Sequence, residues 1–96
     1  GVLSLDVGRH TCIVAGAEVP LTATELNVLR VLMQSPGRVT GRAQLVDAVW
    51  GVGSPVSDRT LDSHLRNLRA KLAAAGCTDA IETLHGVGLR MGSCVG

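Results

Sequence analysis

The 96-residue sequence predicts an α+β fold with an N-terminal antiparallel sheet, three helices and a C-terminal β-hairpin. Two patterns support this prediction. Short apolar runs of β-strand type occur in the first twenty residues and again near residue 81, and a leucine repeat of helical spacing follows residue 58. Glycine and proline residues separate these segments, as is typical of turns and loops.

The first twenty residues are expected to form three short strands. Residues 2–5 precede a turn near Gly8, residues 11–14 form the second strand, and residues 18–21 form the third. Pro20 lacks an amide hydrogen, so it confines the third strand to an edge.

The first helix is predicted to begin at a capping box. Thr22 can accept a hydrogen bond from the amide of Glu25, whose carboxylate can reach back to the amide of Thr22. Leu21 and Leu26 can form a hydrophobic staple around this cap. Residues 35–37 end the helix. The stripe facing the core consists of Leu26, Leu29, Leu32 and Met33.

A second helix is expected after Thr40, its predicted cap, and ends with Trp50 and Gly51. Residues 51–56 have no periodicity and form a loop. The third helix is capped by Ser57 or Asp58, runs to about Ala75 and is followed by Gly76 in a left-handed conformation.

The third helix has two faces with different chemistry. One carries Leu61, Leu65, Leu68 and Leu72, at the spacing that stacks side chains along one stripe. The opposite face carries Arg59, Ser63, Arg66 and Asn67, and Asp62 and Arg69 lie along one edge. Guanidinium and amide groups match guanine and adenine edges and phosphate oxygens. This face therefore indicates a DNA partner.

Residues 80–84 alternate as a strand, residues 85–88 turn, and residues 89–91 return as a second strand. Three helices followed by a hairpin predict a winged helix-turn-helix, and we expect residues 92–96 to fray.

Composition limits the possible functions. Nine basic and eight acidic residues give a net charge of +1, so only local clustering can favour a nucleic acid. One Trp without Phe or Tyr argues against stacking on unpaired bases. The three cysteines lack metal-ligand spacing and are interpreted as thiols in a reducing cytosol. We expect a cytoplasmic protein that is not an enzyme and has no cofactor, metal site, signal peptide or membrane span.

Several motifs resemble one family over nearly the whole chain, from Leu3 to Met91. In order they are Leu21-Thr22-x-Thr24-Glu25, Gly37-Arg38-Val39-x-x-Arg42-x-x-Leu45, Val49-Trp50-Gly51, Asp58-Arg59-Thr60-Leu61-Asp62-x-His64-Leu65-x-x-Leu68-Arg69-x-Lys71-Leu72 and Ile81-x-Thr83-x-x-Gly86-x-Gly88-x-Arg90. Each is weak alone, but together they resemble the effector domain of OmpR/PhoB-type response regulators.

The resemblance implies a winged helix with a four-stranded N-terminal sheet. Its third helix enters the major groove of double-stranded DNA, and the wing contacts the minor groove. The loop from Trp50 to Ser57 would contact RNA polymerase. Family members bind direct repeats as head-to-tail dimers and carry an upstream receiver; other regulatory modules also occur there.

On this basis we expect residues 1–96 to form one winged-helix DNA-binding domain, cut from a longer regulator of a two-component system. Residues 1–21 form the sheet, 22–76 the three-helix core and 79–91 the wing. The candidate DNA-binding residues are Trp50, Arg59, Asp62, Ser63, His64, Arg66, Asn67, Arg69, Thr83, His85 and Arg90.

Several of these candidates have a second interpretation. Arg59 and Arg69 are expected to bind phosphate, although Arg69 can instead pair with Asp62 or with another acidic residue. Asp62 is interpreted as an orienting partner for an arginine, a selector against wrong bases or a plain surface acid. Trp50 anchors the core between the second helix and the sheet or donates to a phosphate. His64 is structural or binds phosphate.

The wing and the third helix also depart from the family pattern. Thr83 matches a backbone-contacting position, and Arg90 contacts phosphate or braces the hairpin. His85 replaces a frequent Arg, which weakens insertion into the minor groove. Asn67 replaces a frequent Arg and favours adenine. An alternative function is a protein-interaction winged helix whose third helix packs on another protein.

Overall fold

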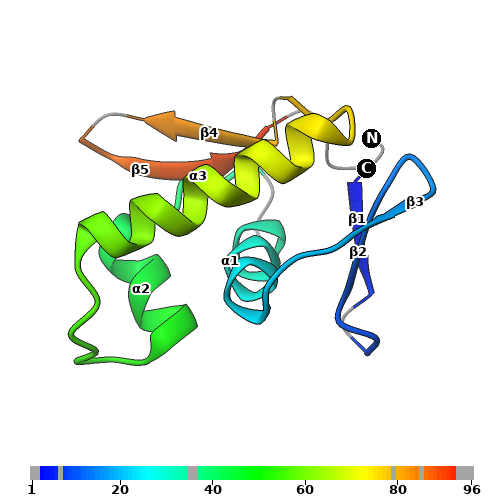
Figure 1. Ribbon diagram of the computed structural model, residues 1–96. Coiled ribbons are helices and arrows are strands. Elements are labelled where there is room, and N and C mark those ends of the chain that lie inside the picture. Colours follow the sequence, from blue (N-terminus) through cyan, green and yellow to red (C-terminus); the bar gives the residue numbers. More distant parts are fainter. Residues whose placement is uncertain (1–2, 7, 35–36, 79, 85, 93–96) are drawn as a thin grey trace.

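The computed structural model describes residues 3–6, 8–34, 37–78, 80–84 and 86–92. Three strands lead into three helices, and a hairpin follows (Figure 1). The N-terminal sheet and the loop between α2 and α3 lie at opposite ends of the molecule, and α3 spans the distance between them (Figure 1). The α+β winged helix-turn-helix predicted from the sequence is confirmed.

The N-terminal sheet contains β1 (Leu3–Asp6), β2 (Thr11–Val14) and β3 (Ala17–Val19), antiparallel and in that order. Leu3 pairs with Val14, and Cys12 pairs with Val19. The implied four-stranded sheet is not what the described residues form, because the chain reverses direction only twice between Leu3 and Val19. The edge position of β3, which ends before Pro20, agrees with the prediction.

Helix α1 (Ala23–Met33) begins at the predicted capping box. Thr22 Oγ1 accepts a hydrogen bond of 3.2 Å from the amide of Glu25, and Glu25 Oε1 accepts one of 2.9 Å from the amide of Thr22. Helix α1 packs against α2, α3 and β5. It is therefore the central element on which the other elements are placed.

Helix α2 (Arg42–Trp50) starts one residue later than predicted, with Gly41 and not Thr40 at the N-cap. The backbone of Thr40 is engaged elsewhere: it exchanges two hydrogen bonds, of 2.7 and 2.9 Å, with Leu89 of β5. In place of a threonine cap, Gln44 Oε1 accepts from the amide of Gly41 at 3.1 Å.

The C-terminal hairpin, called the wing below, consists of β4 (Ile81–Leu84) and β5 (Gly88–Met91). Gly88 is needed where Thr40 approaches β5, because a Cβ atom at residue 88 would lie 2.2 Å from the carbonyl oxygen of Thr40. The start of α2 and the wing are thus joined through backbone atoms.

Helix α3 (Asp58–Ala74) has a defined cap at each end. Ser57 is the N-cap, and its hydroxyl accepts from the amide of Thr60 at 3.2 Å. At the other end Gly76 has a φ of 101°, and the amide of Cys77 donates to the carbonyl of Leu72 at 2.8 Å. This is a Schellman motif, and it agrees with the predicted role of Gly76.

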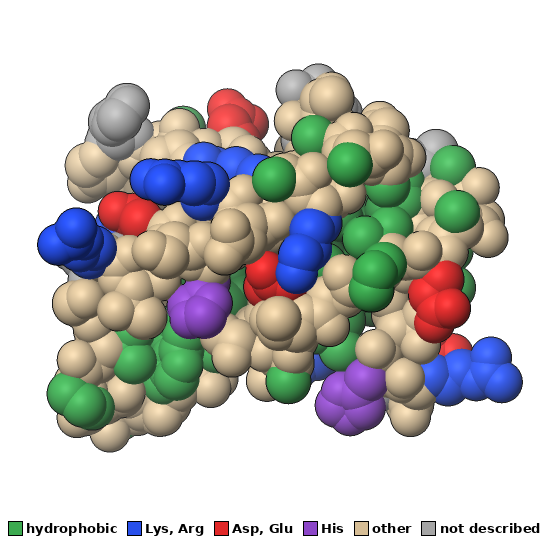
Figure 2. Space-filling model, in the orientation of Figure 1, with side chains coloured by type: hydrophobic (Ala, Val, Ile, Leu, Met, Phe, Trp, Pro, Cys, Tyr) green, Lys and Arg blue, Asp and Glu red, His purple; other side chains and the backbone are tan. Residues whose placement is uncertain are grey.

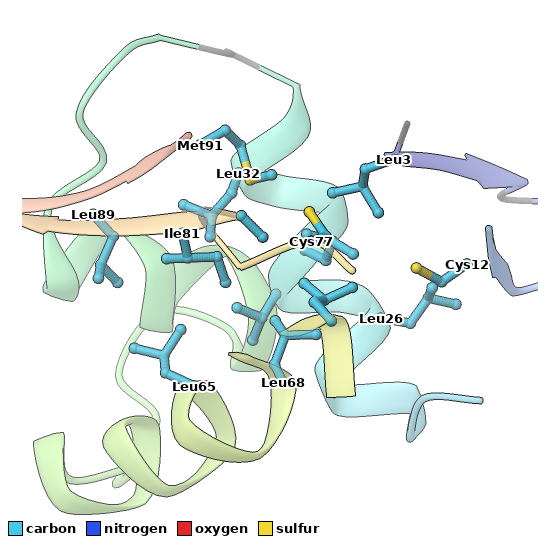
Figure 3. Close-up of a cluster of buried hydrophobic side chains, with 14 of the residues drawn as sticks. Leu3, Cys12, Leu26, Leu32, Leu65, Leu68, Cys77, Ile81, Leu89 and Met91 are labelled. Carbon is cyan, nitrogen blue, oxygen red and sulfur yellow. The ribbon is translucent and has the colours of Figure 1, made fainter. Parts of the chain in front are cut away.

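The core is built mainly from aliphatic side chains of the N-terminal sheet, the helices and the wing (Figure 3). Cys12 lies in it as a free thiol, and burial raises the pKa of this thiol, which disfavours the reactive thiolate. The prediction that every cysteine is a thiol is wrong for Cys77, which is disulfide-bonded. Spacing along the chain does not give the distance between two cysteines in the fold. No helix in the described part of the chain is long and apolar enough to cross a membrane.

Candidate nucleic-acid interface

The outward face of α3 is exposed and accessible to a partner. Its leucine stripe is inside the protein: Leu61, Leu65, Leu68 and Leu72 are 0–3% exposed. The polar face predicted from the same helix, consisting of Arg59, Ser63, Arg66 and Asn67, is exposed. Arg59 and Arg66 are seven residues apart, which places their Cα atoms about 10 Å apart along the helix axis.

Two arginines on this face have no partner among the residues that the structure describes. Within the described residues, neither Arg59 nor Arg66 has a salt-bridge or hydrogen-bond partner for its guanidinium. Ser63 donates its hydroxyl hydrogen to the backbone carbonyl of Arg59 at 3.1 Å, so its oxygen is left as an acceptor. The face therefore presents hydrogen-bond donors from the arginines, and both donors and acceptors from Ser63 and Asn67.

A groove separates α3 from the wing. It has a volume of about 320 Å³ and is lined by Arg42, Asp62, Leu65, Arg66, Arg69 and Thr83. A second hollow of about 350 Å³ shares Arg42 and Thr83 with this groove and continues along residues 84 and 86–88 of the wing. Lys and Arg side chains gather over α3 and the wing, with acidic side chains among them (Figure 2).

Two contacts across the groove fix its walls. Arg42 Nη2, on α2, donates to Asp62 Oδ1, on α3, at 2.6 Å. Arg69 donates to the hydroxyl oxygen of Thr83 on β4. The alternative in which Arg69 pairs with Asp62 is not what the structure shows, because the wing brings Thr83 to Arg69 and α2 brings Arg42 to Asp62. Arg69 Nε is buried without a hydrogen-bond partner among the described residues, which is costly for a donor.

Trp50, the last residue of α2, and His64 of α3 lie side by side. Their ring centroids are 5.6 Å apart, and the ring planes are inclined by 40°. Trp50 is half-buried at the end of α2 and packs against the core. Trp50 therefore contacts a ring of α3, whereas the sequence analysis placed Trp50 between α2 and the sheet. His64 is also half-buried, so part of each side chain is accessible to a ligand.

The described residues of the wing form an ion pair. Arg90 Nη2 donates to Glu82 Oε2 at 2.8 Å, and the two residues are direct partners in the β4–β5 register. Arg90 therefore braces the hairpin, although 35% of its side chain is exposed. Such an exposed pair contributes less than about 1 kcal/mol. The candidate His85 lies outside the described residues.

Arg42 lines the groove but was not among the sequence candidates. It is the first residue of α2, at the positive end of the helix dipole, where a cation is unfavourable. A basic residue in the first turn of a predicted helix was the signal in the sequence that could have drawn attention to it.

On the outward face of α3, at the groove and on the wing, the described side chains include five arginines (Arg42, Arg59, Arg66, Arg69 and Arg90) and two carboxylates (Asp62 and Glu82). Five minus two gives a charge of +3 for these seven side chains, although the whole chain carries only +1. Lys71 of α3 is not counted, because it pairs with Glu25 of α1. Positive charge is therefore concentrated on the face that also presents free donors, an arrangement suited to a polyanion.

The family model described as "Transcriptional regulatory protein, C terminal" matches residues 16–91. The chain belongs to this family. The resemblance to OmpR/PhoB-type effector domains is confirmed by the same match and by the relatives below. Similar members of this family are regulators from several bacteria.

The phosphate regulon transcriptional regulatory protein PhoB of Rhizobium meliloti is 41% identical over 93 residues, which are 97% of this chain and 41% of that protein. The sensory transduction protein RegX3 of Mycobacterium leprae is 38% identical over 94 residues, 97% of this chain and 48% of that protein. The chain thus spans less than half the length of these relatives.

Two solved structures similar to this family member contain DNA segments. The DNA binding domain of the response regulator AdeR, in complex with an intercistronic region, has a TM-score of 0.87 and 27% identity, covering 97% of this chain and 96% of that one. The Klebsiella pneumoniae RstA DNA-binding domain, in complex with the RstA box, has a TM-score of 0.83 and 26% identity, covering 96% and 92%.

Proposed function

We propose that this domain binds double-stranded DNA in a sequence-specific manner and regulates transcription as the output domain of a two-component response regulator. The main support is the outward face of α3, where Arg59 and Arg66 are free while the leucines of the same helix are buried. The likeness to the AdeR and RstA domains, both solved with DNA, supports the same function.

In the proposed complex α3 enters the major groove. Arg66 donates to guanine edges, Asn67 bonds adenine, and Ser63 accepts or donates at either base. Arg59, Arg69 and Thr83 hold backbone phosphates, with Trp50 and His64 beside them, and these contacts set the register without reading sequence. The wing, with Arg90 and His85, adds contact with the minor groove.

Further partners are part of the proposal. The loop from Trp50 to Ser57 would contact RNA polymerase; in this loop the side chain of Val52 is 90% exposed. Two copies would bind direct repeats as a head-to-tail dimer. A receiver or other regulatory domain would precede residue 1 in the full protein, since the relatives are more than twice as long. A regulator of bacterial transcription acts on the chromosome, so we place it in the cytoplasm.

The test begins with selection of bound duplexes from a random pool, followed by fluorescence anisotropy with the selected duplex between 50 and 200 mM salt. If about six phosphates are neutralised, affinity should fall about a thousandfold over this range. Arg66→Ala should reduce the preference for the selected duplex at least tenfold and leave the melting temperature within about 4 °C, since surface substitutions change stability by about 0.5 kcal/mol or less.

Two outcomes would contradict the proposal. An unchanged chain that retains no duplex from the pool would favour the protein-interaction alternative. A chain that binds DNA equally well with Arg66→Ala would show that α3 does not read the bases.

A further inference from the structure

We propose that Arg42, at the start of α2, binds a phosphate of the DNA backbone, and that Asp62 is the positioning residue that holds its guanidinium at the groove. This inference rests on the proposed DNA binding and adds a contact from a second helix. It also assigns one role to Asp62, because its carboxylate binds the guanidinium of Arg42 and does not contact a base.

The location of Arg42 is the first support. Arg42 lines both the groove between α3 and the wing and the hollow that continues along the wing. Its side chain is 31% exposed, so its guanidinium is accessible while it is held by Asp62. A DNA strand bordering the major groove that α3 enters would pass over this junction.

The chemistry of the groove is the second support. Among the described residues, Arg42, Arg66 and Arg69 line it together with one carboxylate, that of Asp62. Three cations and one anion leave a charge of +2, which suits a phosphodiester. The oxygen of Thr83 accepts from Arg69, so the Thr83 hydroxyl hydrogen is directed elsewhere and can donate to a phosphate oxygen.

The rigidity of the site is the third support. Thr40, two residues before Arg42, is joined to Leu89 of β5 by two backbone hydrogen bonds. The start of α2 is therefore fixed relative to the wing, and the 2.6 Å contact with Asp62 fixes it relative to α3. A phosphate bound by Arg42 would therefore have a fixed position relative to both α3 and the wing, the two elements proposed to contact DNA.

The test measures the salt dependence of binding to the selected duplex and to an unrelated duplex. Arg42→Ala should weaken binding to both duplexes by a similar factor, about tenfold at 100 mM salt, and should lower the slope of log affinity against log salt by about one. Arg9→Ala, which removes the same charge from the turn between β1 and β2, is the matched control and should leave the slope unchanged.

Arg42→Lys keeps the charge but not the planar fork, so it should retain the slope and lose only part of the affinity. It also keeps the proposal testable if Arg42→Ala is poorly folded by thermal melting. The contact would be overturned if a folded Arg42→Ala chain kept the slope of the unchanged chain. It would also be overturned if Arg42→Ala and Arg9→Ala lowered the slope equally. If the unchanged chain binds neither duplex, the proposed function itself fails.

A double-mutant comparison tests the role of Asp62. Without Arg42, the carboxylate of Asp62 only repels phosphate, so Asp62→Ala should improve binding at least about threefold more in the Arg42→Ala chain than in the unchanged chain. Equal effects of Asp62→Ala in the two chains would mean that Asp62 acts independently of Arg42, and would overturn its positioning role.

Discussion

Lys71 Nζ, on α3, lies 2.6 Å from Oε1 of Glu25, on α1, and the same oxygen accepts from the amide of Thr22. The Glu25 side chain is 3% exposed and that of Lys71 is 38% exposed. Burial by itself raises the pKa of the Glu25 carboxyl, but the hydrogen bonds from Lys71 and Thr22 outweigh it, so this pKa lies below its ordinary value. One carboxylate thus joins the cap of α1 to the last turn of α3.

This ion pair predicts acid sensitivity. As the pH falls below about 4.3, the ordinary pKa of a glutamate, Glu25 takes up a proton in the unfolded chain before it does so in the folded one. The stability that it contributes is present above that pH and is lost as the pH falls through the lower pKa of the folded state. Urea denaturation from pH 7 to pH 3 should show the loss.

Glu25→Gln should remove this part of the pH dependence and lower the stability at pH 7, because Lys71 and Thr22 then face a neutral amide. Glu18→Gln, at an exposed position of β3, is the matched control. The same pH dependence in the Glu25→Gln and unchanged chains would contradict the role given to this carboxylate.

Gly88→Ala should destabilise the fold by about 1–3 kcal/mol, because the added methyl group overlaps the Thr40 carbonyl and forces β5 away from the start of α2. Gly86→Ala is the comparison. A Cβ there meets nothing within 4 Å, and only its φ of 75° is unfavourable, at about 1 kcal/mol. Denaturant unfolding of both variants should therefore rank Gly88→Ala as the more harmful. The reverse ranking would contradict the close approach.

The two faces of α3 should separate stability from binding. Leu68 is fully buried, so Leu68→Ala should cost about 2–5 kcal/mol of unfolding free energy. Arg66→Ala should change that free energy by about 0.5 kcal/mol or less. Chemical denaturation measures both. A large loss of stability on Arg66→Ala would mean that this face is packed against the protein in solution.

Asn67 should determine one base of the preferred site. Asn67→Arg should shift the preference at one position from adenine to guanine, because a guanidinium matches the O6 and N7 atoms of guanine. Selection from a random duplex pool with both chains measures the change. Recovery of the same sequences by both would place Asn67 away from the bases.

The local features of this fold were predictable from the sequence. The capping box of Thr22 and Glu25 and the glycine after α3 are determined by residues at most five positions apart, and both agree with the structure. The leucine stripe of α3 agrees as well, because helical periodicity alone decides which side chains share a face.

The contacts between distant segments were not predictable in the same way. Thr40 has the chemistry of a helix cap, but its backbone pairs with Leu89, 49 residues later, and the cap moved to Gly41. For Arg69 the sequence offered a partner on its own helix, Asp62, as one alternative, whereas the wing supplies Thr83. Both differences have one cause: β5 and β4 lie against the helices only in the folded chain. No rule of sequence spacing reports that approach.

The bridge between Thr40 and Leu89 has a consequence for solubility. Open strand edges are templates on which other chains add and aggregate. At Leu89, β5 has a backbone neighbour on each side, Thr83 in the hairpin and Thr40 before α2, so a strand from another molecule cannot pair there. The segment that leads into α2 thereby covers the edge of β5 at this point and removes it as a site for strand addition by another molecule.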